Sequence, residues 1–125
     1  MAAQAADLFW LDGQREKALQ DLNRDASGLP YSPALSRRIA VMAGELGEWD
    51  LALDRYQQLV EHDDDQITDL YNYITLARYY RPDRLASLMD RAWQKNRNPQ
   101  FALGALYQLE SRRDDQAIDA FLAGL

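Results

Sequence analysis

Residues 47–60 read GEWDLALDRYQQLV, and positions in this stretch return elsewhere in the chain at one fixed distance. Ala52 follows Ala18 by 34 residues and precedes Ala86 by 34 residues. A fixed period of this size is typical of a repeat array, in which helical hairpins stack because none of them can bury its apolar face alone. The stretch therefore predicts an all-α fold built from repeated helix pairs.

Apolar residues recur every three or four positions along the chain, which is the spacing of helices with one buried face. No segment alternates apolar and polar residues, so strands are not expected. The predicted helices cover residues 2–12, 14–27, 33–46, 48–62, 66–80, 82–96, 99–110 and 114–124.

Glycine, proline and capping residues mark the predicted helix ends. Gly47 is expected to end one helix in the left-handed conformation. Ser32 is expected to cap the helix that Pro33 opens. One aspartate among residues 63–65 is expected to cap the helix that follows them, and Pro82 is expected to open the next one.

Length and charge bound the possible functions. The 125 residues suffice for a single array of about four repeats. The net charge of −6 argues against nucleic acid as the partner, because phosphate binding needs a basic face. No run of about 18 apolar residues is present, so no membrane span is predicted. The repeats are expected at residues 1–32, 33–66, 67–97 and 98–125.

Two short motifs point to a particular kind of repeat. A second-helix motif reads Ala52-x3-Tyr56, and a first-helix motif reads Leu103-Gly104-x2-Tyr107. These residues resemble the tetratricopeptide repeat, and the resemblance extends over essentially the whole chain. It implies an α-α superhelix of about four helix pairs whose concave surface binds a partner. The chain ends inside the last helix without a polar cap, so we expect an internal α-solenoid fragment of a longer array.

The second half departs from that pattern. Ala86 and Ala117 are 31 residues apart instead of 34, and the step from Gly104 to Ala117 is one residue longer than its counterpart in the second repeat. Asp90 stands where an aromatic residue is usual. Because burying a lone carboxylate is costly, Asp90 is expected to face solvent or an arginine. We expect an irregular superhelix in this region.

Residues that perform chemistry are scarce. His62, the only histidine, precedes Asp63, Asp64 and Asp65, a group that suits either a small metal loop or a solvated turn between repeats. The spacing and the central glycine of a calcium loop are missing, which favours the turn. Glycine-rich phosphate loops, a nucleophile elbow and cysteine are also missing. We therefore predict that the protein is not an enzyme and has no catalytic residue, cofactor or metal site.

The concave face is expected to carry the binding residues, since first helices line it in tetratricopeptide arrays. Arginine and tyrosine are typical interface anchors, and clustered arginines favour an acidic peptide or a polar polymer. The alternative is that these arginines pair with neighbouring carboxylates. The predicted partner-binding residues are Trp10, Arg37, Arg38, Tyr71, Asn72, Arg78 and Tyr79, with Phe101, Ala105 and Gln108 expected in the last repeat.

The leading hypothesis is a non-catalytic protein-protein interaction scaffold. Lys17 and Lys95 are the only lysines among the 14 basic residues, so the others are arginines. This arginine bias and the irregular repeats resemble the periplasmic repeat region of bacterial exopolysaccharide export proteins of the Pel type. That resemblance implies a biofilm-related scaffold at the periplasmic side of the outer membrane, where it recruits a polysaccharide-modifying enzyme and where the parent protein carries an outer-membrane barrel. Two alternatives stay open: a groove that binds polysaccharide directly, and a cytoplasmic adaptor or chaperone.

Overall fold

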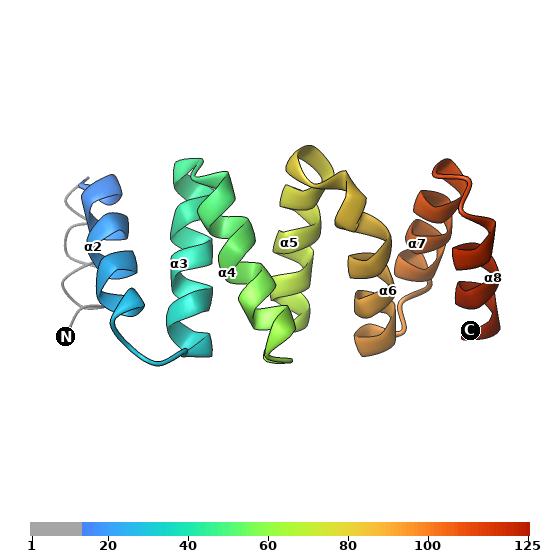
Figure 1. Cartoon of the computed structure of the whole chain (residues 1–125), viewed down its shortest axis with the longest axis horizontal. Coiled ribbons are helices and arrows are strands. Elements are labelled where there is room, and N and C mark those ends of the chain that lie inside the picture. The colour runs from blue at the N-terminus through green and yellow to red at the C-terminus, as the bar shows by residue number, and fades with distance from the viewer. Residues whose placement is uncertain (1–13) are drawn as a thin grey trace. The chain divides into compact units, whose positions relative to one another are not determined.

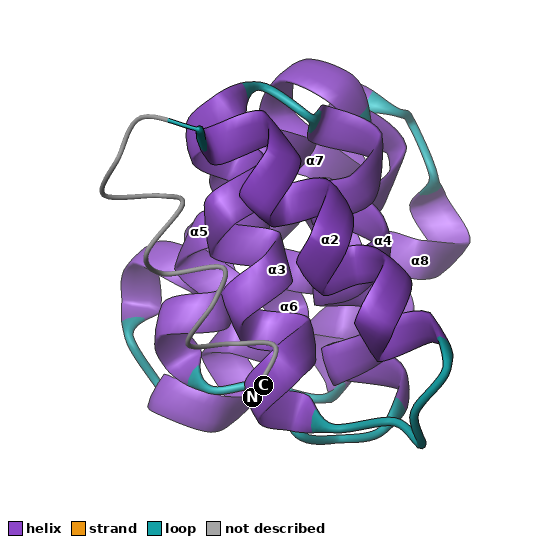
Figure 2. Ribbon diagram, turned by 90° about the vertical axis from the view of Figure 1, so that its left-hand side faces the viewer, coloured by secondary structure: helices purple, strands orange, loops and turns teal. Residues whose placement is uncertain are grey.

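The computed structural model describes residues 14–125, which form helices joined by short turns, with no strand among them (Figure 1; Figure 2). The predicted all-α fold is therefore confirmed for this part of the chain. The predicted helix at residues 2–12, with Trp10, lies outside the described residues. The helices are α2 (Arg15–Ser27), α3 (Pro33–Leu46), α4 (Trp49–Glu61), α5 (Ile67–Tyr80), the short 3-10 helix η1 (Pro82–Arg84), α6 (Leu85–Asn96), α7 (Pro99–Ser111) and α8 (Asp115–Ala123).

Two compact units divide the chain, and their boundary falls between Asp65 and Gln66. In the described residues, unit 1 contains α2, α3 and α4, and unit 2 contains α5, η1, α6, α7 and α8. Each unit has a core of its own. Leu59 has no exposed surface in unit 1, and Leu70 and Tyr73 have none in unit 2.

Alanines determine how closely the helices of unit 1 pack. Ala18, Ala40, Ala43 and Ala52 have no exposed surface. Small side chains let neighbouring helix backbones approach, and a large side chain one turn away fills the space that remains. Tyr56, one turn after Ala52, is 3% exposed and has this filling role.

The ends of α3 follow the sequence prediction. The Ser32 hydroxyl accepts a hydrogen bond from the Leu35 amide at 3.4 Å, and Pro33 is the first residue of the helix. Gly47 ends α3 with φ of 79°, a left-handed conformation that costs a residue with a Cβ more than it costs glycine.

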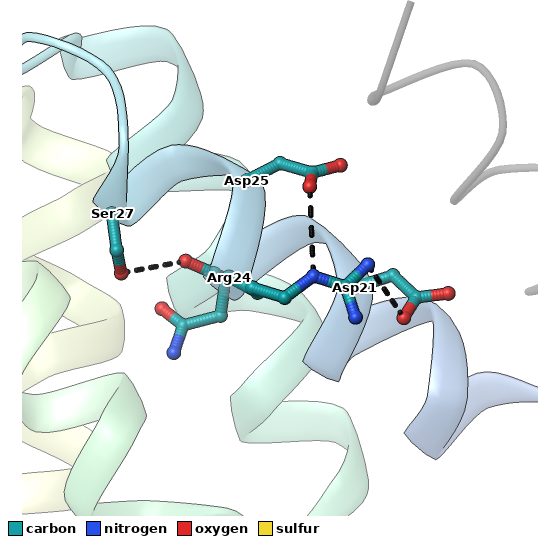
Figure 3. A network of polar contacts seen from close by, with 5 residues as sticks. Asp21, Arg24, Asp25 and Ser27 are labelled. Atoms are coloured by element: carbon teal, nitrogen blue, oxygen red, sulfur yellow. Dashed lines mark hydrogen bonds and ion pairs between the residues drawn. The ribbon is translucent and has the colours of Figure 1, made fainter.

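The last turn of α2 is closed by exposed polar contacts (Figure 3). The Arg24 guanidinium lies 3.1 Å from the Asp21 carboxylate and 3.7 Å from that of Asp25. The Ser27 hydroxyl donates a hydrogen bond to the Asn23 carbonyl at 2.8 Å. A cation at this end of a helix also complements the helix dipole.

The start of α5 differs from the sequence prediction. Gln66 is the N-cap, and the expected aspartate among residues 63–65 is not. The backbone amide of Gln66 donates to the Asp69 carboxylate at 2.8 Å, and the Gln66 side chain accepts from the amide of Asp69. This reciprocal capping box satisfies two amides at once, so a glutamine replaces the shorter residues that usually cap alone.

The start of the next helix also differs. Residues 82–84 form a 3-10 turn, and the α-helix begins at Leu85 instead of Pro82. Hydrogen bonds to α5 and to the residue that follows α7 hold this turn. The Arg84 guanidinium donates to the Tyr73 hydroxyl at 2.8 Å, and that of Arg112 donates to the Pro82 carbonyl at 2.8 Å.

Packing in unit 2 is uneven. Helix α6 packs more extensively against α7 than against α5. The close approach of α6 and α7 occurs at Gly104, where a Cβ would lie 2.7 Å from the Met89 sulfur. Asp90, one residue along α6, is half-buried and accepts a hydrogen bond from the Gln94 amide at 3.3 Å.

Candidate interaction site

A pocket of about 570 Å³ lies in unit 2, between α5, α6 and α7. This volume falls within the range of about 300–1,000 Å³ that is usual for binding sites. Most of its lining is apolar or aromatic. The lining residues are Ile74 and Arg78 from α5, Met89 from α6, and Gln100, Phe101, Leu103, Gly104, Tyr107 and Gln108 from α7.

Helix α7 contributes most of this lining because of how it meets α6. Its close contact with Met89 is at Gly104, and Ala105 has no exposed surface. The side chains of Leu103 and Tyr107 are 62% and 66% exposed. Ala105 was expected to line the groove and is buried instead, whereas Leu103 and Tyr107 were identified only as part of the first-helix motif and were not among the predicted groove residues. The lengthened step from Gly104 to Ala117 marks this part of the array as irregular in sequence, but it does not predict which side chains are exposed.

Two aromatic side chains connect α5 with α7 on the same surface. The ring centroids of Tyr71 and Phe101 are 5.3 Å apart, and the Asn96 amide donates to the Tyr71 hydroxyl at 3.5 Å. Tyr71 is 43% exposed and lies two turns before Arg78 on α5. The structure therefore brings Tyr71, Phe101 and Arg78 together on the faces of α5 and α7.

The other two predicted residues of α5 are exposed outside the pocket. Tyr79 is 79% exposed, with its ring centroid 6.4 Å from that of Tyr80. Asn72 is exposed as well and does not line the pocket. Both side chains are accessible to a partner that extends beyond the pocket.

Arg78 is the one charged residue of the pocket lining. Its side chain is exposed, and it makes no hydrogen bond or ion pair with another residue between 14 and 125. The other arginine contacts of unit 2 are internal, such as the hydrogen bond of Arg84 to the Tyr73 hydroxyl and that of Arg112 to the Pro82 carbonyl. Arg78 thus presents a guanidinium that the described residues leave available for a ligand.

The predicted arginines of unit 1 have a different setting. Arg37 and Arg38 are half-buried on α3, and the Arg37 guanidinium donates to the Asp64 carbonyl at 3.1 Å. They belong to unit 1, so the structure does not place them relative to the pocket of unit 2. Their role in binding a partner stays a prediction.

The segment that follows α4 is tied to the loop before α3. The rings of Tyr31 and His62 stack at a centroid distance of 3.7 Å and an angle of 9°. The Tyr31 hydroxyl donates to the Asp64 carboxylate at 2.9 Å. Burial of the hydroxyl, together with this hydrogen bond and the charge of Asp64, raises the pKa of Tyr31 to about 12. Asp65 is 4% exposed.

These contacts give the acidic residues 63–65 a structural role, because Tyr31 and Arg37 both bind Asp64 beside α3. Among residues 14–125, no group of three or more histidine, cysteine, aspartate or glutamate side chains is arranged to hold a metal ion. Within the same residues, no helix is both long and apolar enough to cross a membrane.

The helix pairs and the exposed pocket define a helical repeat module of the kind that binds other molecules. The family model of the tetratricopeptide repeat matches residues 1–125, and the chain belongs to this family. No curated protein and no solved structure matches it. The predicted membership of the tetratricopeptide family is therefore confirmed. A relationship to the Pel-type export proteins remains a proposal.

Proposed function

We propose that this protein is a non-catalytic scaffold that binds another protein through the α5–α7 pocket. Tetratricopeptide repeats generally mediate protein-protein interaction. The observation that carries the proposal is the joint exposure of Leu103, Tyr107 and Tyr71 beside Arg78 on one surface of unit 2. Large apolar and aromatic side chains with an arginine are the residue types that dominate binding energy at protein interfaces.

The pocket lining supports binding in preference to catalysis. It contains no serine, cysteine, histidine, aspartate or glutamate, so it offers neither a nucleophile nor a general base near neutral pH. Its polar groups are one guanidinium, two side-chain amides and one phenol, which suit recognition.

The narrower proposal places this scaffold at the periplasmic side of the outer membrane in a bacterial exopolysaccharide export system. There it recruits a polysaccharide-modifying enzyme. This proposal is supported by the arginine bias and the irregular repeats of the sequence. The alternative, a cytoplasmic adaptor, would bind its partner through the same pocket. The two proposals therefore differ in the compartment and not in the binding chemistry.

Direct binding of polysaccharide is a second candidate, favoured by the exposed rings of Tyr71, Tyr79 and Tyr107. Aromatic faces are suited to stacking, and an extended polymer reaches beyond the pocket to Tyr79.

Site-specific cross-linking separates these functions. A photo-reactive phenylalanine analogue at Tyr107 is expected to capture a specific protein, and the same analogue at Asp119, an exposed position on α8 outside the pocket, is not. Capture of polysaccharide in place of protein supports the second candidate. Equal capture of protein from both positions overturns the proposed site.

The predicted contribution of unit 1 has its own test. The double substitution Arg37→Glu/Arg38→Glu is introduced into the protein that carries the cross-linker at Tyr107. A loss of capture without loss of helical content supports contact of these arginines with the partner. Unchanged capture assigns binding to unit 2 alone.

A further inference from the structure

We infer that the α5–α7 pocket takes a peptide segment that carries one carboxylate side chain next to a large apolar side chain. The juxtaposition behind this inference is a single guanidinium, Arg78, at the edge of an otherwise uncharged pocket lined by Met89, Phe101 and Leu103. The inference rests on the proposed function and specifies the partner of the same site.

The charge of the pocket selects a carboxylate. Its nine lining residues include one cation and no acid, although the whole chain has a net charge of −6. A planar guanidinium binds a carboxylate through two parallel hydrogen bonds, which fixes both geometry and charge. Arg78 has no hydrogen-bond or ion-pair partner among residues 14–125 that a ligand would need to displace.

The apolar part of the pocket selects a large aliphatic or aromatic side chain. Gly104 contributes no side chain, and beneath it lies Met89, which is 6% exposed. A methionine thioether is flexible and polarisable, so it adapts to ligand side chains of different shape. Leu103 and Tyr107 are more than half exposed without a ligand, and a ligand that covers them removes their apolar surface from water, which stabilises the complex.

Amide groups favour a peptide over a fatty or purely aromatic ligand. Gln100 and Gln108 line the same pocket, each with two N–H donors and a carbonyl acceptor. A peptide backbone offers the complementary donors and acceptors, whereas an alkyl chain would leave these amides without hydrogen bonds when it covers them.

The single positive charge of Arg78 and the net negative charge of the chain limit how many carboxylates the bound peptide can carry. One guanidinium neutralises one carboxylate, and further acids would face a chain with net charge −6. Charges separated by less than the Debye length of about 8 Å at physiological salt still repel each other. We therefore expect a segment with one acid at the pocket to bind more tightly than a long acidic run.

An array of short synthetic peptides tests this chemistry on the full chain. Each fluorescent peptide carries one glutamate and one leucine at a varied separation on a background of alanine, serine and glutamine. Matched peptides replace the glutamate by lysine, the leucine by alanine, or add three further glutamates. Fluorescence anisotropy is expected to give the tightest binding for a Glu/Leu peptide and about tenfold weaker binding for its lysine and alanine counterparts, or about 1.4 kcal/mol.

Charge reversal assigns the preference to one residue. Arg78→Glu is expected to abolish the preference for glutamate and to favour the lysine peptide. Arg81→Glu, at an exposed arginine three residues further on and outside the pocket, is expected to leave the preference unchanged. Far-ultraviolet circular dichroism verifies that both variants fold.

Two outcomes overturn the inference and leave the proposed function standing. The first is binding that does not distinguish glutamate from lysine, or a preference that survives Arg78→Glu. The second is failure of every peptide to bind while the cross-linker at Tyr107 still captures a protein. If neither peptides nor proteins are bound at this pocket, the proposed function and the inference fail together.

Discussion

Several arginines and tyrosines of unit 1 are used differently from those at the α5–α7 pocket of unit 2. In unit 1, Arg37 holds the Asp64 carbonyl, Arg55 bridges Asn23 and Gln58, and Tyr31 stacks on His62. In unit 2, Arg78 and the rings of Tyr79 and Tyr107 are directed to solvent. The internal contacts of Arg37, Arg55 and Tyr31 in unit 1 therefore contribute to the free energy of unfolding. The side chains of Arg78 and Tyr107 at the pocket of unit 2 are available to contribute to binding.

The difference shows that residue type alone does not identify a binding surface. An arginine that already donates to a carbonyl of its own chain must lose that hydrogen bond before it can bind a partner. An exposed arginine without such a bond loses only its hydration. Substitutions that remove matched residues from the two units should therefore separate stability from binding.

The largest expected effect compares two leucines. Leu59 has no exposed surface in unit 1, so Leu59→Ala should lower the free energy of unfolding by about 2–5 kcal/mol, measured by urea denaturation. Leu103 in unit 2 is 62% exposed, so Leu103→Ala should change that free energy by less than about 0.5 kcal/mol and should weaken peptide binding instead. A similar loss of stability in both variants would contradict the division of roles.

A second comparison tests the helix contact that orients the pocket. Gly104→Ala brings a Cβ to 2.7 Å from the sulfur of Met89, which is 6% exposed and has little room to shift, so the overlap should cost up to about 1–3 kcal/mol. Alanine in a helix gains about 0.5–1 kcal/mol over glycine, which offsets part of this cost. We expect a net loss of stability in thermal unfolding.

The effect of Gly104→Ala on the free energy of unfolding should change from a loss to a gain when Met89 is replaced by alanine. In a Met89→Ala background, Gly104→Ala meets no sulfur, so the gain in helix propensity of about 0.5–1 kcal/mol should remain. If Gly104→Ala destabilises both backgrounds equally, the close contact of α6 with α7 is not what determines the exposure of Leu103 and Tyr107.

A third comparison sets two arginines of unit 1 against each other. Arg55 on α4 is half-buried, and it donates to Asn23 on α2 at 2.6 Å and to Gln58 at 3.1 Å. Arg24, whose side chain is 72% exposed, forms ion pairs with Asp21 and Asp25 of its own helix. Arg55→Ala should cost about 1–2 kcal/mol of unfolding free energy, and Arg24→Ala less than about 0.5 kcal/mol.

Arg55→Ala is expected to cost more because Arg55 is partly buried. Burial also lowers the pKa of the Arg55 guanidinium, and the charge of Asp54 partly offsets this shift. Chemical denaturation at low and high salt distinguishes the two arginines further, because exposed pairs are screened more strongly. Equal losses for both variants would show that helix-to-helix hydrogen bonding adds nothing to unit 1.

The smallest expected effect concerns Tyr31. Tyr31→Phe removes the hydrogen bond to Asp64 and should cost about 0.5–1.5 kcal/mol near neutral pH. The pKa of Tyr31 is about 12 in the folded protein and about 10 in the unfolded chain, so the neutral hydroxyl stabilises the fold. This contribution is present below pH 10 and is lost as the pH rises toward 12.

The stability difference between wild type and Tyr31→Phe should therefore shrink as the pH rises from 9 toward 12, while the fold is monitored by circular dichroism. A difference that does not change with pH would mean that the phenol and Asp64 are not coupled in unit 1.

Most of the helical framework could be predicted from the sequence, because period and capping are local signals. Ser32 and Gly47 mark the start and the end of α3, as expected. The two differences, at Gln66 and Pro82, arise from side-chain contacts. Asp69 completes the cap of α5, and Tyr73 with Arg84 holds the 3-10 turn. The spacing of apolar residues and helix-ending residues does not encode such side-chain hydrogen bonds.

The site could be predicted only in part. Arg78, Phe101 and Gln108 were assigned to a partner-binding face, and the structure places all three at the pocket. Leu103 and Tyr107 were missed because they entered the sequence prediction only as part of the first-helix motif. Their exposure depends on where α7 meets Met89, which is a tertiary contact that a single repeat pattern does not encode.

The capping box that starts α5 has a consequence for how the chain is made. Both of its partners, Gln66 and Asp69, lie on the same side of the unit boundary. A nascent chain can therefore begin α5 from its own first turn, without a hydrogen bond borrowed from the preceding hairpin. A gene segment that starts at the codon for Gln66 encodes both residues that start α5. Recombination could therefore move such a segment to another array together with the hydrogen bonds that begin its first helix.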